Sequence, residues 1–84
     1  MKRPAAPRIE AGQRYKVQTD WASSSIRSLL YDADAHTLDI EYPSGEVYRY
    51  FHVPAAGFTA MFTTDSLGTF VNKEIKPNYR FEKL

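Results

Sequence analysis

The sequence contains no cysteine among its 84 residues, which excludes disulfide bonds, thiolate metal sites and a cysteine nucleophile. A small domain without disulfides depends on packing alone, which suits the reducing cytoplasm, and we expect the protein to be located there. No apolar run approaches the roughly 18 residues of a membrane span. The basic N-terminus has no apolar stretch behind it, so we expect neither a secretory signal nor contact with a membrane.

The sequence also lacks the motifs of the common active sites. Its four glycines, at positions 12, 45, 57 and 68, are scattered and form no phosphate-binding loop. Residues 23–25 are serines without a Gly-x-Ser-x-Gly motif, and they are better interpreted as turn and edge hydrogen-bonding residues than as nucleophiles. The pairs Asp32 with Asp34 and Asp39 with Glu41 lie on turns and strands, where carboxylates usually solvate a surface. We therefore predict a protein that is not an enzyme and needs no cofactor.

The formal net charge is only +1, but the charge is distributed unevenly along the chain. Residues 1–19 carry a net charge of +4, residues 20–71 carry −5, and residues 72–84 carry +2. Basic ends attract phosphate through counterion release, whereas an acidic sheet repels it. The pattern is therefore compatible with nucleic-acid binding but does not require it.

Residues 1–14 combine two prolines, small residues and much of the basic excess, and are predicted to form a flexible basic N-terminal tail. The remaining residues, 15–84, are predicted to form a single domain, as expected for this length. Residues 15–21 are expected to lie against that domain. Trp21, the only tryptophan, is interpreted as a packing residue where the tail meets the fold.

Three segments have the composition of strands and are separated by turn residues. Residues 37–42 alternate apolar and polar side chains, residues 46–53 are rich in Val, Tyr and Phe, and residues 26–32 follow a polar serine turn. These three segments predict an antiparallel meander.

Two helical segments and a short strand are predicted after the meander. Pro54 suits the first turn of a helix over residues 55–63, and Pro77 ends a second helix over residues 67–75. Residues 79–82 alternate in polarity and predict a short C-terminal strand at a sheet edge. The expected fold class is therefore α+β, with two short helices packed on one face of the sheet.

The hairpin between the second and third predicted strands admits two registers. A two-residue loop, Ser44-Gly45, would pair Tyr42 with Val47 and place Tyr48 and Tyr50 on the outer face. That face would then be an aromatic platform of the kind that stacks RNA bases.

A three-residue loop, Pro43-Ser44-Gly45, gives the second register through a type I turn and a glycine bulge. Proline and glycine both occupy the positions that this turn favours. Asp39 then lies opposite Arg49, a favourable cross-strand pair. We predict this bulged register, with Tyr48 and Tyr50 facing the core and a mixed, charged outer face. A binding site is then expected at the helices or at the sheet edge.

His36 and His52 fall opposite each other in the bulged register, with Asp34 nearby. Two imidazoles at a strand end do not complete a tetrahedral metal site, and no cysteine is present to help. We therefore interpret both as ordinary surface histidines and predict no metal site.

The start of the second predicted helix is the strongest candidate for an anion site. Free amides at a helix start attract anions, and basic residues follow. The hypothetical nucleic-acid or anion-binding residues are Ser66, Gly68, Asn72, Lys73, Lys76 and Arg80. In the alternative interpretation, Ser66 only caps the helix and Gly68 allows close packing against the sheet.

Several short motifs occur in order along the chain: Ser24-Ser25-Ile26, Tyr31-Asp32, Leu38-x-Ile40-x-Tyr42-x-Ser44-Gly45, Tyr48-x-Tyr50, Val53-Pro54, Ser66-x-Gly68 and Asn72-x-x-Ile75. In this combination the chain resembles the KTSC domain over about residues 21–79. That family is named for its occurrence at the C-terminus of some lysyl-tRNA synthetases. It also occurs as a free-standing short protein in bacteria.

The resemblance implies no established activity, and its link to a synthetase suggests RNA binding by association. The family's second helix often carries an aromatic pair after Ser-x-Gly, whereas this chain has Phe70-Val71 and lacks one ring. A ligand of that ring would be bound less tightly here. The motif residues to which we assign a structural role are Gly45, Tyr48, Tyr50 and Pro54.

These inferences predict a small, non-enzymatic binding module that acts as a monomer. The leading hypothesis is an accessory module for RNA, in which the basic tail and the residues around Lys73, Lys76 and Arg80 contact phosphate. The alternative is a protein–protein interaction module that uses a sheet edge or an exposed aromatic residue.

Overall fold

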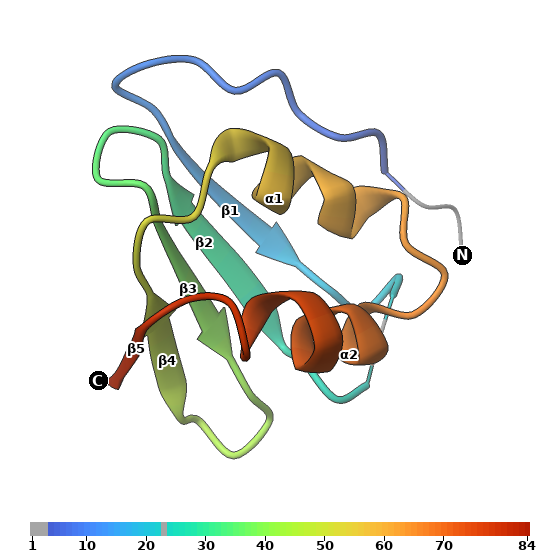
Figure 1. The fold of residues 1–84 in the computed structure, drawn as a ribbon. Coiled ribbons are helices and arrows are strands. Elements are labelled where there is room, and N and C mark those ends of the chain that lie inside the picture. Colours follow the sequence, from blue (N-terminus) through green and yellow to red (C-terminus); the bar gives the residue numbers. More distant parts are fainter. Residues whose placement is uncertain (1–3, 23) are drawn as a thin grey trace.

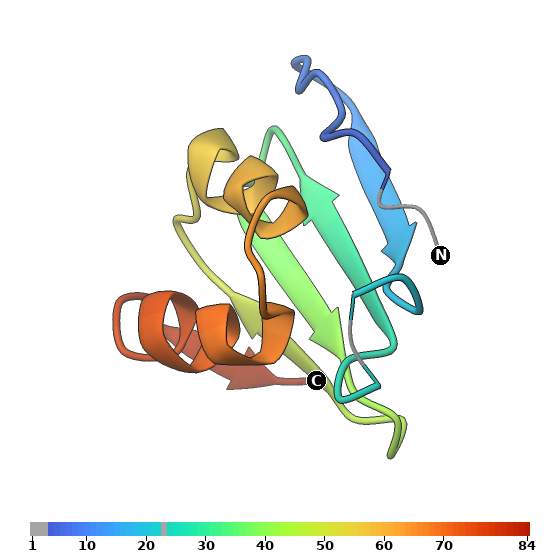
Figure 2. The same ribbon diagram turned by 90° about the vertical axis from the view of Figure 1, so that its right-hand side faces the viewer.

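A computed structural model describes residues 4–22 and 24–84, so the first three residues of the predicted tail and Ser23 lie outside the described residues. One antiparallel sheet is covered on a single face by two short helical segments (Figures 1 and 2). The predicted α+β class is therefore confirmed. The strands lie in chain order: β1 (Arg14–Gln18), β2 (Ser28–Asp32), β3 (Thr37–Glu41), β4 (Val47–Tyr50) and β5 (Phe81–Lys83).

The meander is longer than the three strands predicted from the sequence. The expected C-terminal strand is present as β5, which pairs with β4. The additional strand is β1, which pairs with β2 and places Tyr15 beside Tyr31 and Val17 beside Leu29. With only two apolar residues in alternation, β1 has a weak strand pattern of its own. Its pairing with β2 supplies the hydrogen bonds that fix it.

The residues before β1 make local contacts with that strand and with the turn after β2. The Tyr15 hydroxyl donates to the Arg8 carbonyl at 3.1 Å and accepts from the Glu10 amide at 2.7 Å. The Gly12 amide donates to Asp34 at 2.8 Å, and Ile9 packs against the core. The flexibility expected for residues 1–14 stays a prediction.

The hairpin between β3 and β4 has the bulged register. Leu38 pairs with Tyr50 and Ile40 with Tyr48, as predicted. Gly45 has a φ of +92°, in the left-handed region that favours glycine. The Tyr42 amide donates to the Glu46 carbonyl at 2.9 Å, which closes the three-residue loop. The two-residue loop, and with it an outer tyrosine platform, is excluded.

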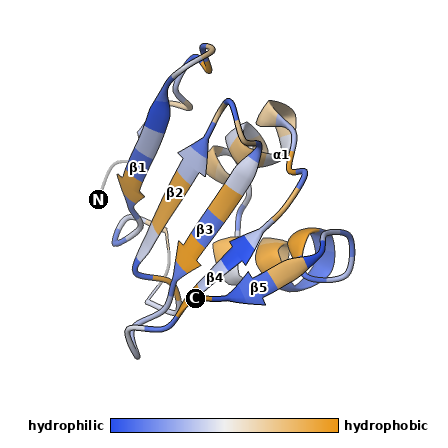
Figure 3. Ribbon diagram, turned by 90° about the vertical axis from the view of Figure 1, so that its left-hand side faces the viewer, coloured by the Kyte–Doolittle hydropathy of each residue, from blue (hydrophilic) through white to orange (hydrophobic). Residues whose placement is uncertain are grey.

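The outer face of the sheet is polar and charged, and the hydropathy of β3 alternates residue by residue (Figure 3). Asp39 lies opposite Arg49, whose guanidinium donates to its two carboxylate oxygens at 2.8 and 2.9 Å. Asp39 is only 8% exposed, so this two-point ion pair covers the centre of the outer face. A bidentate pair of this kind is geometrically specific.

The core lies between the sheet and the helices and is built around aromatic rings. Tyr31 and Phe58 stack with ring centroids 4.8 Å apart, and Phe62 meets Phe58 edge-on at 5.3 Å. The Tyr31 hydroxyl donates to the Val53 carbonyl at 2.6 Å, so its buried polar group is satisfied. Trp21 stacks on Phe62 at 5.7 Å, which confirms its predicted packing role.

The helical segments occupy the predicted positions. The first comprises α1 (Ala55–Thr59) and the 3₁₀ turn η1 (Ala60–Phe62), and it follows Pro54. The second comprises α2 (Leu67–Phe70) and the π-helical turn η2 (Val71–Ile75). Ser66 caps α2 by accepting a hydrogen bond from the Thr69 amide at 3.3 Å.

Two glycine-to-alanine substitutions should change stability in opposite directions. Gly45→Ala forces a side chain into the left-handed region and should lower the free energy of unfolding by about 1–2 kcal/mol. Gly68→Ala adds a Cβ that meets nothing within 4 Å inside a helix, and should raise it by about 0.4–1 kcal/mol. Urea denaturation of both variants beside the native chain measures the difference. Destabilisation of equal size in both would contradict the role given to Gly45.

Candidate functional site

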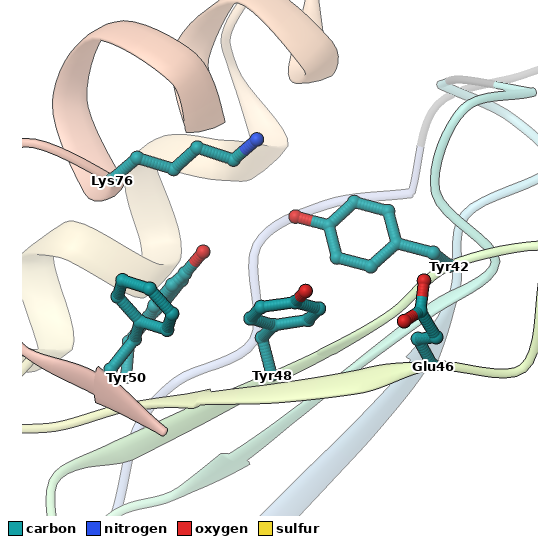
Figure 4. A pocket seen from close by; sticks show the side chains of 6 residues that line it. Tyr42, Glu46, Tyr48, Tyr50 and Lys76 are labelled. Atoms are coloured by element: carbon teal, nitrogen blue, oxygen red, sulfur yellow. The ribbon is translucent and has the colours of Figure 1, made fainter. Parts of the chain in front are cut away.

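The core face of the β3–β4 hairpin becomes progressively less covered toward its loop. Tyr50 is 1% exposed, whereas Tyr48, two residues nearer the loop, is half-buried, as is Tyr42. The uncovered end forms a hollow of about 350 Å³ (Figure 4). Its lining residues come from the hairpin, from β5 and from the end of η2: Tyr42, Glu46, Tyr48, Tyr50, Lys76 and Phe81. We call this hollow the tyrosine pocket.

Aromatic rings form the floor and walls of the tyrosine pocket. Tyr42 stands perpendicular to Tyr48, with ring centroids 5.7 Å apart and an angle of 89°. Phe81 lies 5.6 Å from Tyr48 at 41° and 5.8 Å from Tyr50 at 71°. Tyr48 is therefore flanked by rings on two sides, and its own face is directed toward the helix side of the pocket (Figure 4).

Two oppositely charged groups flank these rings. Lys76 extends its ammonium over the Tyr42 ring, with Nζ 6.0 Å from the ring centroid. Glu46 enters from the hairpin loop, accepts a hydrogen bond from the Ser44 hydroxyl at 3.2 Å, and forms a 2.5 Å ion pair with Lys83. Lys83 holds the pKa of Glu46 below its usual range, so this carboxylate is charged at neutral pH.

Two phenols of the pocket, those of Tyr42 and Tyr50, are neutral at neutral pH. Burial raises the pKa of both Tyr42 and Tyr50 above the ordinary value. The Tyr42 hydroxyl is buried and has no regular hydrogen bond within the described residues. Interaction with the Tyr50 hydroxyl offsets part of the rise in the Tyr42 pKa. An aromatic hollow with one anion and one cation beside it suits a flat ring that carries polar edges.

The residues of the predicted anion site are distributed over different parts of this surface. Ser66 and Lys73 line a separate hollow, which also contains Asp65 and Glu74. Lys76 lines the tyrosine pocket instead. Three of the six predicted residues, all within the part of the chain that the structure describes, thus line two different hollows, and anion binding by the set stays a prediction.

The other three predicted anion-site residues, Gly68, Asn72 and Arg80, line neither hollow. Arg80 stacks on Phe51, with its guanidinium carbon 4.9 Å from the ring centroid, and Asn72 is exposed. Ser66 does cap the helix, as the alternative interpretation held. The same interpretation is wrong about Gly68, because a Cβ built there has open space around it.

The two histidines occupy unusual backbone positions. His36 and His52 have φ values of 56° and 59°, and the His36 carbonyl accepts from the Val53 amide at 2.9 Å. Within residues 4–22 and 24–84, no three His, Cys, Asp or Glu side chains are grouped closely enough to hold a metal ion.

The helices of the described residues are all too short to span a membrane.

Sequence reasoning missed half of the tyrosine pocket. Tyr42, Glu46 and Phe81 were not among the candidate binding residues, and Tyr48 was assigned a structural role. A usable signal was present, because the bulged register places Tyr42 opposite Glu46 on the face that carries Tyr48. What the sequence does not show is where the second helix stops covering that face.

The comparisons with known proteins agree on one family. The KTSC domain model matches residues 22–79, which confirms the resemblance expected from the sequence. An uncharacterized protein from Stutzerimonas stutzeri is 43% identical over 63 residues, which cover 74% of this chain and 89% of that protein. The crystal structure of a KTSC domain protein from Yersinia pestis has a TM-score of 0.76 at 26% identity, and the match covers 86% of this chain and 99% of that one.

A lysine–tRNA ligase from Nostoc punctiforme is also similar, with 39% identity over 61 residues. The matched region covers 73% of this chain but only 11% of the ligase. The chain therefore corresponds to a small part of that enzyme.

Because burial raises the pKa of its phenols, the protein should become less stable at alkaline pH. Burial raises the pKa of Tyr50 in the folded state above its ordinary value of 10.0. The stabilisation is therefore fully present below pH 10.0 and is lost as the pH rises toward the folded-state pKa. We expect the free energy of unfolding to decline above about pH 10, and Tyr50→Phe to reduce that decline. Urea denaturation between neutral and alkaline pH measures both curves, and parallel curves would refute the assignment.

Proposed function

The chain belongs to the KTSC domain family, and we propose that it is a non-enzymatic module that binds single-stranded RNA through the tyrosine pocket. The observation that carries the proposal is the half-buried ring of Tyr48, flanked by two other rings with the Lys76 ammonium beside it. Proteins that recognise unpaired RNA stack splayed bases on aromatic side chains of this kind. A volume of about 350 Å³ lies within the usual range for small-ligand sites.

The phosphates would follow the basic residues near the pocket. Lys76 lines the pocket, whereas Lys73, in the π-helical turn η2, lines the separate hollow that also contains Asp65 and Glu74. Arg80 stacks on Phe51 and does not line the pocket. In this proposal Lys76 contacts the RNA backbone while the tyrosine pocket holds one base. Phosphate is repelled by the Glu46 carboxylate and attracted by the Lys76 ammonium, so the RNA backbone should lie on the Lys76 side of the pocket.

The relatives give independent support. A segment similar to this chain forms 11% of a lysine–tRNA ligase, a protein whose name includes an RNA substrate. A small domain joined to such an enzyme is well placed to add contacts to RNA. This support comes only from association with a relative, and the proposal rests on the geometry of the pocket.

A protein-interaction role is the second candidate, and the edge strand β5 favours it. Phe81 and Leu84 are the large exposed hydrophobic residues of the described chain, at 53% and 59% exposure. Both lie at the C-terminal edge of the sheet, where a partner strand could add to β5. Leu84→Ser distinguishes the candidates, because Leu84 does not line the tyrosine pocket. The substitution should abolish capture of a protein partner but leave RNA affinity unchanged.

Substitutions in the pocket should weaken RNA binding in a residue-specific way. Tyr48→Leu removes the stacking surface and should cost about 1–3 kcal/mol of binding free energy. Lys76→Gln removes one phosphate contact and should lower the slope of log affinity against log salt by about 0.7. Fluorescence anisotropy with a labelled, mixed-sequence RNA at several salt concentrations measures both effects.

Lys16→Gln is the matched control for Lys76→Gln. It removes the same charge from the opposite face of the sheet, where Lys16 lies near Asp39 and Glu41. The control should bind RNA like the native chain if the pocket is the site. Equal losses in the two lysine variants would indicate non-specific attraction, and no binding at low salt would refute the RNA proposal.

A further inference from the structure

We infer that the tyrosine pocket selects guanine, because its rim combines the Glu46 carboxylate with the Lys76 ammonium beside an aromatic floor. This inference rests on the proposed function and names the base that the pocket takes. The two charged groups approach from different elements, Glu46 from the hairpin loop and Lys76 from the end of η2 (Figure 4). A flat ligand on Tyr48 would therefore meet a hydrogen-bond acceptor from the hairpin loop and a donor from the end of η2.

The acceptor capacity of Glu46 is only half used. An ionised carboxylate offers about four lone-pair sites. The Ser44 hydroxyl occupies one of them at 3.2 Å, and the Lys83 ammonium occupies another at 2.5 Å. Two sites remain for donors on a ligand. Since Lys83 keeps the carboxylate ionised, Glu46 accepts hydrogen bonds and donates none.

Guanine is the base whose pairing edge fits a free carboxylate. Its N1 and N2 groups are adjacent donors, so both can bond the two oxygens of one carboxylate. Adenine and cytosine each offer a single amino group beside an acceptor, and uracil offers one N–H between two acceptors. An acceptor beside Glu46 would be repelled, which disfavours these three bases. An aspartate or glutamate that reads a base edge works by accepting from such donors.

Lys76 complements the remaining atom of the same edge. The O6 carbonyl of guanine lies next to N1 and needs a donor. The Lys76 ammonium has three donors, lies 6.0 Å from the centre of the Tyr42 ring, and carries no ion pair within the described residues. It can therefore reach O6 with one donor and a phosphate with another. Tyr48 supplies the stacking surface below.

A panel of 5′-mononucleotides tests the inference directly. All members carry the same phosphate, so differences in affinity report on the base. Guanosine monophosphate should bind about tenfold more tightly than the adenosine, cytidine and uridine monophosphates. Inosine monophosphate lacks the N2 amino group and should fall between them. Calorimetric titration at low salt measures the five constants, and equal affinities would overturn the inference.

Glu46→Gln should remove the preference rather than all binding. The variant loses the charged acceptor, so the affinity ratio of guanosine to adenosine monophosphate should fall from about ten to near one. Glu82→Gln is the matched control, because it removes the same charge from β5 at a residue paired with Arg49, outside the pocket. The control should keep the native ratio. An unchanged ratio in Glu46→Gln, with native circular dichroism, would refute the role of Glu46.

Oligonucleotides separate this inference from the proposed function and identify the source of the guanine. We would compare a uridine pentamer with the same pentamer carrying one central guanosine. Tighter binding of the second RNA than of free guanosine monophosphate supports guanine within RNA as the ligand. Equal binding of both pentamers refutes guanine selection but leaves RNA binding intact. Binding of the free nucleotide without binding of either pentamer refutes the RNA proposal and keeps the guanine site.

Discussion

The structure depends on one backbone constraint, the left-handed conformation of Gly45 in the hairpin loop. With φ at +92°, this residue adds the bulge that sets the pairing of β3 with β4. A shift of one residue would move every side chain of β4 to the opposite face. The bulge therefore decides that Tyr50 enters the core while Arg49 reaches Asp39 on the outer face. Both the core and the pocket follow from that choice.

Much of the fold could be predicted from the sequence, because local signals and the global arrangement agree. The Pro43-Ser44-Gly45 turn specifies the register, and cross-strand pairing of Asp39 with Arg49 favours the same answer. The helical segments begin after Pro54 and Ser66, which are recognisable helix-start residues. Strand β1 was not predicted as a strand, since its pattern is short and its stability comes from pairing with β2.

The tyrosine pocket was harder to predict than the fold. Sequence reasoning identified Lys76, and it identified the face on which Tyr48 and Tyr50 lie. It did not show that Tyr50 is covered while Tyr48 is half open, because that difference depends on where η2 ends above the sheet. Phe81 joins the pocket only through the pairing of β5 with β4, a contact between segments about 30 residues apart. Such contacts leave no local pattern.

The helices cover only part of the aromatic face of the β3–β4 hairpin, so its buried part belongs to the core and its open part forms the pocket. Under the helices, Tyr50 is sealed and contributes to stability as any core residue does. Beyond them, Tyr48 and Tyr42 would form an exposed apolar patch if nothing polar surrounded them. Glu46, Lys76 and Lys83 provide that polar surround, and their charges restrict which flat molecules can replace water there. The charged residues that surround the open end of the core thus also give the pocket its selectivity.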